Sequence, residues 1–184
     1  KGTIFGFSPR MRYDLVVNTF LKFALSEGMM NLHYGGEMWR PLVDIQDAAS
    51  AYILALEAPE EKVAGEVINI ATQNYRVSEL ALKVYQILND NHINVRIKSD
   101  YRYKGVRSYR VSTDKADKLL GFRPKITLEE SIINMLEKIN EYGYTDFSHP
   151  RYYNIAWMKL LEEIQDIIQC TNTIFEAPQK RATE

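Results

Sequence analysis

The amino-acid sequence predicts an α/β protein, because segments with strand periodicity alternate with segments of helical periodicity along most of the chain. Apolar residues recur at three- and four-residue spacing over residues 13–26, whereas residues 93–97 alternate strictly between apolar and polar side chains. The chain has 184 residues, 46% of them hydrophobic and 26% charged, which is typical of a globular chain with one core or one and a half. We therefore expect a small mixed sheet with packed helices, followed by an extra C-terminal helix.

Short extended segments supply the predicted strands. They are residues 3–5, 31–34, 40–45, 65–71 and 93–97. Pro41 excludes a helix around it, so the third of these segments must be extended, and Gly35 with Gly36 forms the turn before it. The strict alternation in the last segment favours a half-exposed strand at a sheet edge.

The predicted helices begin and end at residues with capping preferences. They run over residues 13–26, from Asp47 to Pro59, from Ser78 to Leu88, from Ser112 to Gly121, from Thr127 to Ile139, and through Ile155 to Ile168 in the tail. Asp47, Ser78 and Ser112 are the expected N-caps. Thr127 and Glu130 have the spacing of a capping box. The polar end from Pro178 is expected to fray.

The charge balance argues against two classes of partner. With 23 Lys+Arg against 24 Asp+Glu, the formal charge is -1, which gives no broad field to attract nucleic acid or an anionic membrane. Cys170 is the single cysteine, and no run of about 18 apolar residues is present to span a bilayer. We expect a cytoplasmic protein, and because Lys1 is neither an initiator methionine nor part of a signal peptide, a chain that starts in the middle of a longer one.

Several motifs with known chemistry are missing from the sequence. None of the nine glycines has GxGxxG or GxxGxxG spacing, so the chain has no recognisable phosphate cradle. None of the twelve tyrosines is followed by lysine four residues later, so the Tyr-x-x-x-Lys pair of short-chain dehydrogenases is absent. His33, His92 and His149 lack the spacing of metal ligands. We therefore predict neither catalytic residues nor a metal in this chain.

The segment from Gly2 to Leu56 resembles the second half of the extended short-chain dehydrogenase/reductase family, the NAD-dependent epimerases and dehydratases that act on nucleotide sugars. The matching motifs are Thr3–Gly6, Ser8–Arg12, Asp14–Asn18, Tyr34–Gly36 and Arg40–Ala49. Downstream, Asn69, Arg107–Ser112, Lys115–Ala116 and Leu120–Pro124 continue the resemblance, which covers roughly residues 2–140.

The resemblance implies the C-terminal part of an extended Rossmann-type fold. Residues 1–148 would be the nucleotide-sugar-binding portion, and residues 149–184 an additional helix and tail. The parent enzyme would use bound NAD to oxidise a sugar hydroxyl to a keto intermediate and then epimerise, dehydrate or re-reduce it. A missing N-terminal part would hold the catalytic pair and most of the NAD site, and the protein would be a homodimer. By this reading the chain alone is not catalytic.

Two other interpretations remain open from the sequence. The first is a non-catalytic nucleotide-binding or regulatory module that retains the fold. The second is an interaction domain in which the tail helix, with Trp157 and its aliphatic stripe, pairs with another subunit.

Arginines are the first candidates for substrate binding, because a guanidinium fork satisfies the oxygens of a nucleoside diphosphate in pairs. We expect Arg40 and Arg107 in this role, with Arg102 and Arg110 as rivals of Arg107. The competing interpretations are a surface ion pair for Arg40 and a solvated loop for the others.

Three further residues are candidate ligand contacts. Asn18 is predicted to lie opposite the apolar face of its helix and to contact a phosphate or a sugar hydroxyl. Thr3, at a strand end, is a candidate sugar or nicotinamide contact, because open α/β sheets bind ligands at the carboxyl ends of strands. Arg10, together with Arg12, either closes over the ligand or pairs with Asp14.

The remaining candidates have weaker patterns. Tyr103 and Tyr109 either stack on the base or pack locally. Asp47 is interpreted as a structural cap, and no partner is evident for Asp44.

Overall fold

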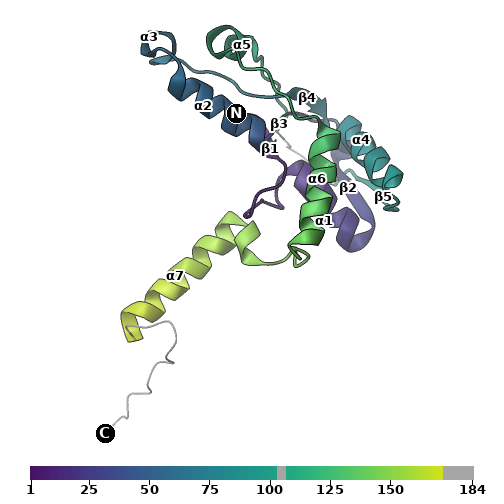
Figure 1. Cartoon of the computed structure of the whole chain (residues 1–184). Helices are drawn as coiled ribbons and strands as arrows, with labels where there is room; N and C mark the ends of the chain where they lie inside the picture. The colour runs from purple at the N-terminus through teal and green to yellow at the C-terminus, as the bar shows by residue number, and fades with distance from the viewer. Residues whose placement is uncertain (103–106, 172–184) are drawn as a thin grey trace. The chain divides into compact units, whose positions relative to one another are not determined.

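The computed structural model describes residues 1–102 and 107–171, and Figure 1 shows the whole chain. The predictions for Tyr103 and for the polar end from Pro178 lie outside these described residues. The chain divides into two compact units, residues 1–147 and residues 148 onward, and each is considered by itself below.

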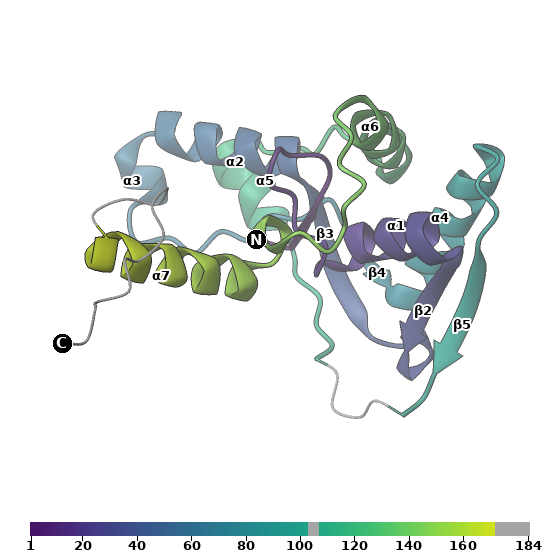
Figure 2. The same ribbon diagram turned by 90° about the horizontal axis from the view of Figure 1, so that it is seen from below.

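The described residues of the first unit contain five strands, which form two small sheets (Figures 1 and 2). The strands are β1 (Thr3–Phe5), β2 (Met29–His33), β3 (Trp39–Asp44), β4 (Gln73–Arg76) and β5 (Arg96–Asp100). A mixed three-stranded sheet has the order β1-β3-β4, with β1 parallel and β4 antiparallel to β3. In a second sheet, β2 and β5 pair in parallel. The expected mixed sheet is therefore present, with a separate pair of strands beside it.

The described helices are seven α-helices and two short 3-10 turns. They are α1 (Val16–Glu27), α2 (Ile45–Glu57), α3 (Glu60–Val63), α4 (Val77–Asp90), α5 (Asp114–Leu120), α6 (Leu128–Glu141) and α7 (Asn154–Thr171), with 3-10 turns at Tyr34–Gly36 and Pro150–Tyr152. Gly28 and Gly121 cap α1 and α5 in the left-handed conformation, at φ 61° and 63°, as glycine does most readily. The tail helix was predicted, whereas the single turn of α3 was not.

The core of the first unit lies where helices cover β2. Helices α1 and α4 contact each other and β2, and α6 packs on α4. Their inward side chains include Leu21, Leu80, Leu88 and Ile132, each fully buried. Removing such side chains from water is the main favourable term in holding these helices on the sheet.

Two strand predictions were wrong in position. Residues 65–71 form no strand, and polar residues 73–76 pair with β3 instead, since the apolar Ile68 and Ile70 pack against α2 and α5. The strand expected at residues 93–97 begins at Arg96, because the N–H of Ile93 closes the end of α4 on the carbonyl of Leu88 at 2.9 Å.

Three cap predictions were also wrong. Asp44, and not Asp47, is the N-cap of α2, and its side chain accepts a hydrogen bond from the N–H of Gln46 at 2.7 Å. Helix α4 begins one residue before Ser78. Ser112 lies just before the N-cap of α5, although its hydroxyl accepts a hydrogen bond from the N–H of Asp114 at 3.3 Å.

The predicted capping box of α6 is confirmed. The Thr127 hydroxyl accepts from the N–H of Glu130 at 3.2 Å, and the Glu130 carboxylate accepts from the N–H of Thr127 at 2.9 Å. These bonds satisfy two backbone donors that the helix itself cannot pair. The bond from the Thr127 N–H, together with a bond that the Thr127 hydroxyl donates to the same carboxylate, lowers the pKa of Glu130.

We expect the substitution Thr127→Ala to lower the free energy of unfolding by about 1 kcal/mol, because the first turn of α6 loses its cap. Thr113→Ala is the matched control, since Thr113 occupies the N-cap of α5 without making a side-chain cap bond. Urea unfolding monitored by circular dichroism measures both changes. Equal losses in the two variants would contradict the cap assignment.

Candidate functional site

A cavity of about 410 Å³ lies between β1, the loop after it and the first turn of α1. We call it the β1–α1 cavity. Three of the predicted site residues, Thr3, Arg10 and Asn18, line it, together with Gly6 and Leu15. The fold thus brings these three residues to one hollow although they come from a strand, a loop and a helix.

Asn18 is buried, and the prediction that it points away from the core was wrong. Its side chain is 2% exposed, because the buried stripe of α1 runs through Val17, Leu21 and Ala24 and includes position 18. The side-chain amide donates to the carbonyl of Arg12 at 3.0 Å, while Oδ1 has no hydrogen-bond partner. A buried acceptor without a donor costs about 1–3 kcal/mol, which a hydroxyl or N–H group of a ligand would offset.

The N-terminus of α1 gives the cavity a positive end. Leu15, at the N-cap, makes no side-chain cap bond, and the first turn contains no acidic residue. The first N–H groups of this 12-residue helix therefore have no side-chain acceptor within the helix, and the helix dipole adds partial positive charge there. Such a terminus favours an anionic ligand.

The two loop arginines have different roles. Arg12 makes a bidentate ion pair with Asp14, with Nε–Oδ1 at 2.9 Å and Nη2–Oδ2 at 2.8 Å, and this pair raises the pKa of Arg12. Arg10 is exposed and lines the cavity. Arg12 is thus the arginine that pairs with Asp14, and Arg10 remains the candidate ligand contact of this loop.

Thr3 lines the cavity, but it does so from the first residue of β1 and not from a carboxyl end. It lies opposite Leu42 of β3. The argument from strand ends therefore does not apply to Thr3, whose candidacy now depends on its place in the cavity.

A second group of candidates gathers where β3 begins. Arg40 is on β3, and residues 107–110 run past it, so that Arg40 Nη1 donates to the carbonyl oxygens of Trp39, at 2.8 Å, and of Arg107. The Trp39 N–H donates to the Ser108 hydroxyl at 3.0 Å. We call Arg40, Arg107 and Arg110 the arginine patch.

Aromatic rings support the arginine patch. The guanidinium of Arg40 lies 5.6 Å from the ring centroid of Tyr109, and that of Arg110 lies 4.9 Å from the Trp39 ring. Cation–π contacts of this kind hold a guanidinium in place without neutralising its charge. Tyr109 therefore packs on Arg40, which is the local role considered for it from the sequence.

No carboxylate of the described residues pairs with an arginine of the patch. Other arginines do have acidic partners, at 2.7 Å for Arg76 with Glu37, 2.7 Å for Arg102 with Asp100 and 3.1 Å for Arg123 with Asp117. The Arg102 contact lowers the pKa of Asp100. Arg102 is thus neutralised, which weakens its case as a rival of Arg107.

Gly2 connects the β1–α1 cavity to the strand that carries Arg40. Gly2 lines the cavity and packs on the backbone of Pro41, next to Arg40, so closely that an added Cβ would lie 2.9 Å from the Pro41 oxygen. Glycine is required there for the two segments to touch.

Asp44 has a partner that the sequence did not reveal. Ser131 of α6 donates its hydroxyl to Oδ2 of Asp44 at 2.5 Å, and both residues are buried. Burial raises the pKa of Asp44, and the nearby Asp47 charge adds to the effect. The available signal was a serine within the apolar stripe of the helix that carries Leu128, Ile132 and Met135.

Asp47 is buried and structural, as interpreted from the sequence, but it caps a loop and not its own helix. Its carboxylate accepts from the N–H of Lys125 at 2.9 Å and of Ile126 at 3.0 Å.

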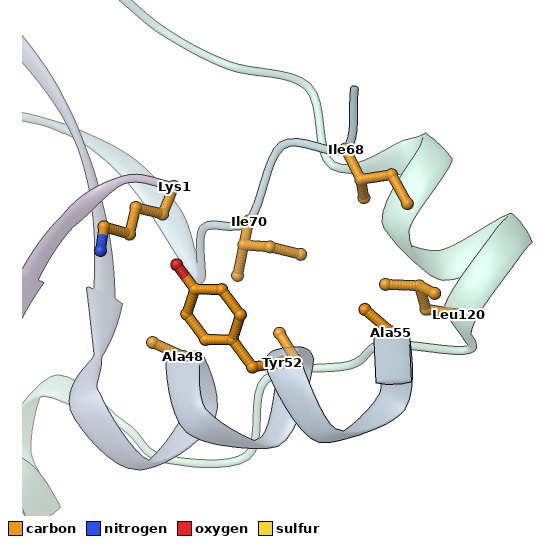
Figure 3. A pocket seen from close by; sticks show the side chains of 8 residues that line it. Lys1, Ala48, Tyr52, Ala55, Ile68, Ile70 and Leu120 are labelled. Atoms are coloured by element: carbon orange, nitrogen blue, oxygen red, sulfur yellow. The ribbon is translucent and has the colours of Figure 1, made fainter. Parts of the chain in front are cut away.

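A smaller hollow of about 140 Å³ lies between α2, residues 68–70 and α5 (Figure 3). Figure 3 shows Ile70, Leu120 and the Tyr52 ring around it, with Lys1 at one side. Its walls are mostly aliphatic, so it lacks the set of donors that a phosphorylated ligand requires.

The family described as "NAD dependent epimerase/dehydratase family" matches residues 5–71. A UDP-N-acetyl-alpha-D-glucosaminuronate decarboxylase from Bacillus cytotoxicus is 22% identical over 143 residues, which are 73% of this chain and 44% of the relative.

Solved structures show the same similarity. The UDP-glucose 4-epimerase of Thermotoga maritima with UDP-glucose has 26% identity and a TM-score of 0.63, over 77% of this chain and 44% of its own. The UDP-glucuronic acid 4-epimerase of Bacillus cereus, in complex with UDP-glucuronic acid and NAD, has 20% identity and a TM-score of 0.63 over the same shares.

The chain is thus similar to the NAD-dependent epimerases and dehydratases of the extended short-chain dehydrogenase/reductase family. The expected Rossmann-type α/β class is confirmed. The chain spans less than half the length of the family members described above.

Among residues 1–102 and 107–171, no three His, Cys, Asp or Glu side chains gather as metal ligands. Within the same ranges, no helix has the length and hydrophobicity needed to cross a bilayer.

We expect the free energy of unfolding of Asp44→Asn to increase, relative to that of the native chain, as pH rises. A carboxyl group whose pKa is raised by folding holds its proton more tightly in the folded state, so its contribution to stability falls as pH rises from about 3.8, its unfolded value, through its folded pKa. The amide does not titrate, and it can keep the cap bond to Gln46. Urea unfolding at about pH 4 and about pH 7 measures the difference between the two proteins. A difference independent of pH would contradict the raised pKa.

Proposed function

We propose that this chain forms the nucleotide-sugar-binding portion of an NAD-dependent sugar epimerase or dehydratase. The match of residues 5–71 to the epimerase/dehydratase family and the relatives that carry UDP-sugars in their names support the substrate class. The observation that carries the proposal is the arginine patch, in which Arg40 lies against the segment that carries Arg107 and Arg110, and none of the three has an acidic partner among the described residues.

The chemistry of a nucleoside diphosphate fits the patch. Its pyrophosphate bears two negative charges, and paired oxygens match the fork of a guanidinium better than a lysine point charge. Arg40 is already oriented by the carbonyl oxygens of Trp39 and Arg107. In our proposal, Arg40, Arg107 and Arg110 hold the pyrophosphate.

The β1–α1 cavity would hold the adjoining part of the same ligand. Asn18 Oδ1 would accept a hydrogen bond from a hydroxyl group, while Thr3 and Arg10, which also line the cavity, would contact the sugar. Gly2, which joins the cavity to the backbone beside Arg40, makes one continuous ligand geometrically reasonable.

A nicotinamide cofactor belongs to the proposed parent activity, and NAD is the form we propose. The residues of this chain do not form its phosphate cradle. The glycines lack the spacing that such a cradle requires. Gly36, one of the most closely packed, lies against the backbone of Ser78 and does not face a cavity. Thr3 is the single residue here that we propose as a cofactor contact. We therefore derive no hydride-transfer step from these residues.

Titration calorimetry with UDP-glucose and UDP-glucuronic acid tests the proposal. We expect Arg40→Ala and Arg107→Ala each to weaken binding by about 1.5–3 kcal/mol, the loss expected when a hydrogen bond to a charged group is removed.

Arg123→Ala is the matched control, because Arg123 is an exposed arginine already paired with Asp117. Its affinity should equal that of the native chain. Equal affinity in all four proteins would return Arg40 to the role of a surface arginine, and no binding by the native chain would reject the proposal.

A further inference from the structure

The loop that forms one wall of the β1–α1 cavity rests on a buried hydrogen bond. Gly6, at φ 102°, ends β1 and lines the cavity, and an added Cβ there would lie 2.5 Å from Oδ2 of Asp44 and 3.1 Å from Oγ of Ser131. Gly6 thus lies directly on the Asp44–Ser131 pair. The left-handed φ and this close approach both exclude a side chain at the position.

Asp44 connects three elements at this point. Its Oδ1 accepts from Gln46 at the start of α2, and its Oδ2 accepts from Ser131, which is 87 positions away on α6. Its own backbone lies at the end of β3, opposite Phe5 of β1. Asp44 is 2% exposed, so water does not replace a lost partner easily.

The same loop has a second attachment to α6. The Phe7 ring stacks on Tyr142, the C-cap of α6, with centroids 5.7 Å apart, and on Tyr144 at 6.2 Å. Ring pairs of this geometry stabilise the contact beyond the area that they bury. Gly6 is therefore held near the start of α6 and Phe7 at its end. Arg10 follows three residues after Phe7.

We propose that Ser131 is a positioning residue for the ligand cavity, acting through Asp44 and Gly6 on the loop that carries Arg10. Ser131 itself is not among the residues that line the cavity. The effect on ligand affinity rests on the proposed function, whereas the effect on the loop does not.

The charged groups around the pair are few. Asp47, on the same helix as the cap, is the one charged side chain that acts on Asp44, and no cation of the described residues lowers the Asp44 pKa. The hydroxyl of Ser131 therefore supplies the main side-chain stabilisation of this carboxylate. Without it, a buried carboxylate would keep only the Gln46 N–H.

Hydrogen–deuterium exchange of Ser131→Ala tests the proposal on the loop. We expect the amides of residues 6–11 to exchange about tenfold faster, because Asp44, on which Gly6 packs, loses the hydrogen bond from Ser131. Ser50→Ala is the matched control, a helix serine whose hydroxyl bonds to the carbonyl of Gln46 on an exposed face. It should leave exchange in residues 6–11 unchanged.

The variant Asp44→Asn removes the charge of this side chain but can keep its hydrogen bonds. The amide can accept from Gln46 and offer its NH₂ group to the Ser131 oxygen, so exchange in residues 6–11 should stay near the native rate. Faster exchange confined to residues 128–141 in Ser131→Ala would overturn the proposal, since it would show a defect of α6 alone.

Calorimetry with UDP as the probe measures the effect of these substitutions on ligand affinity. We expect Ser131→Ala to weaken UDP binding about tenfold and Asp44→Asn to retain it. Native affinity in Ser131→Ala, together with a loss in Arg40→Ala, would reject the positioning role and leave the proposed function intact. If the native chain does not bind UDP, the proposed function fails, and the exchange rates alone decide the role of Ser131.

Discussion

Two buried carboxylates at the junction of β3 and α2 hold together the segments from which the site is built. A carboxylate out of water is tolerated only when it is hydrogen-bonded, and each of these has its donors. Asp44 takes the N–H of Gln46 and the hydroxyl of Ser131, and Asp47 takes two N–H groups of the loop before α6. One short stretch of chain thereby fixes α6, the loop before it and the end of β1. The cavity wall at Gly6 has its position because these bonds are satisfied.

Electrostatics then separate the structural arginines from the candidate ligand contacts. Arg12, Arg76, Arg102 and Arg123 each have a carboxylate within 3.1 Å, so their charges are largely compensated. Arg40 and Arg110 instead lie against aromatic rings, which hold them without cancelling their charge. The formal charge of -1 argues against a broad basic surface, but it averages over this local excess. The arginines that have no carboxylate partner among the described residues are therefore the candidates for binding an anion.

Much of the fold was predictable because local signals and tertiary packing agree. The capping box at Thr127, the C-caps at Gly28 and Gly121, and the extended run around Pro41 all follow from neighbouring residues. Prediction failed where a distant partner decided the outcome. Ile68 and Ile70 have strand periodicity, yet they pack on α2 and α5, and polar residues 73–76 take their place beside β3. Asn18 appeared to be on the outer face of its helix until the buried stripe proved to include it. The pairing of Asp44 with Ser131 spans 87 positions and has no spacing rule.

The central claim is that the arginine patch and the β1–α1 cavity bind one ligand. Nuclear magnetic resonance titration of the ¹⁵N-labelled chain with UDP-glucuronic acid tests it most directly, since backbone amides report on both places at once. The account predicts that the amides of residues 107–110 and of residues 6–18 shift together and give a single dissociation constant. Shifts in one of these segments only, or two different dissociation constants, would contradict it.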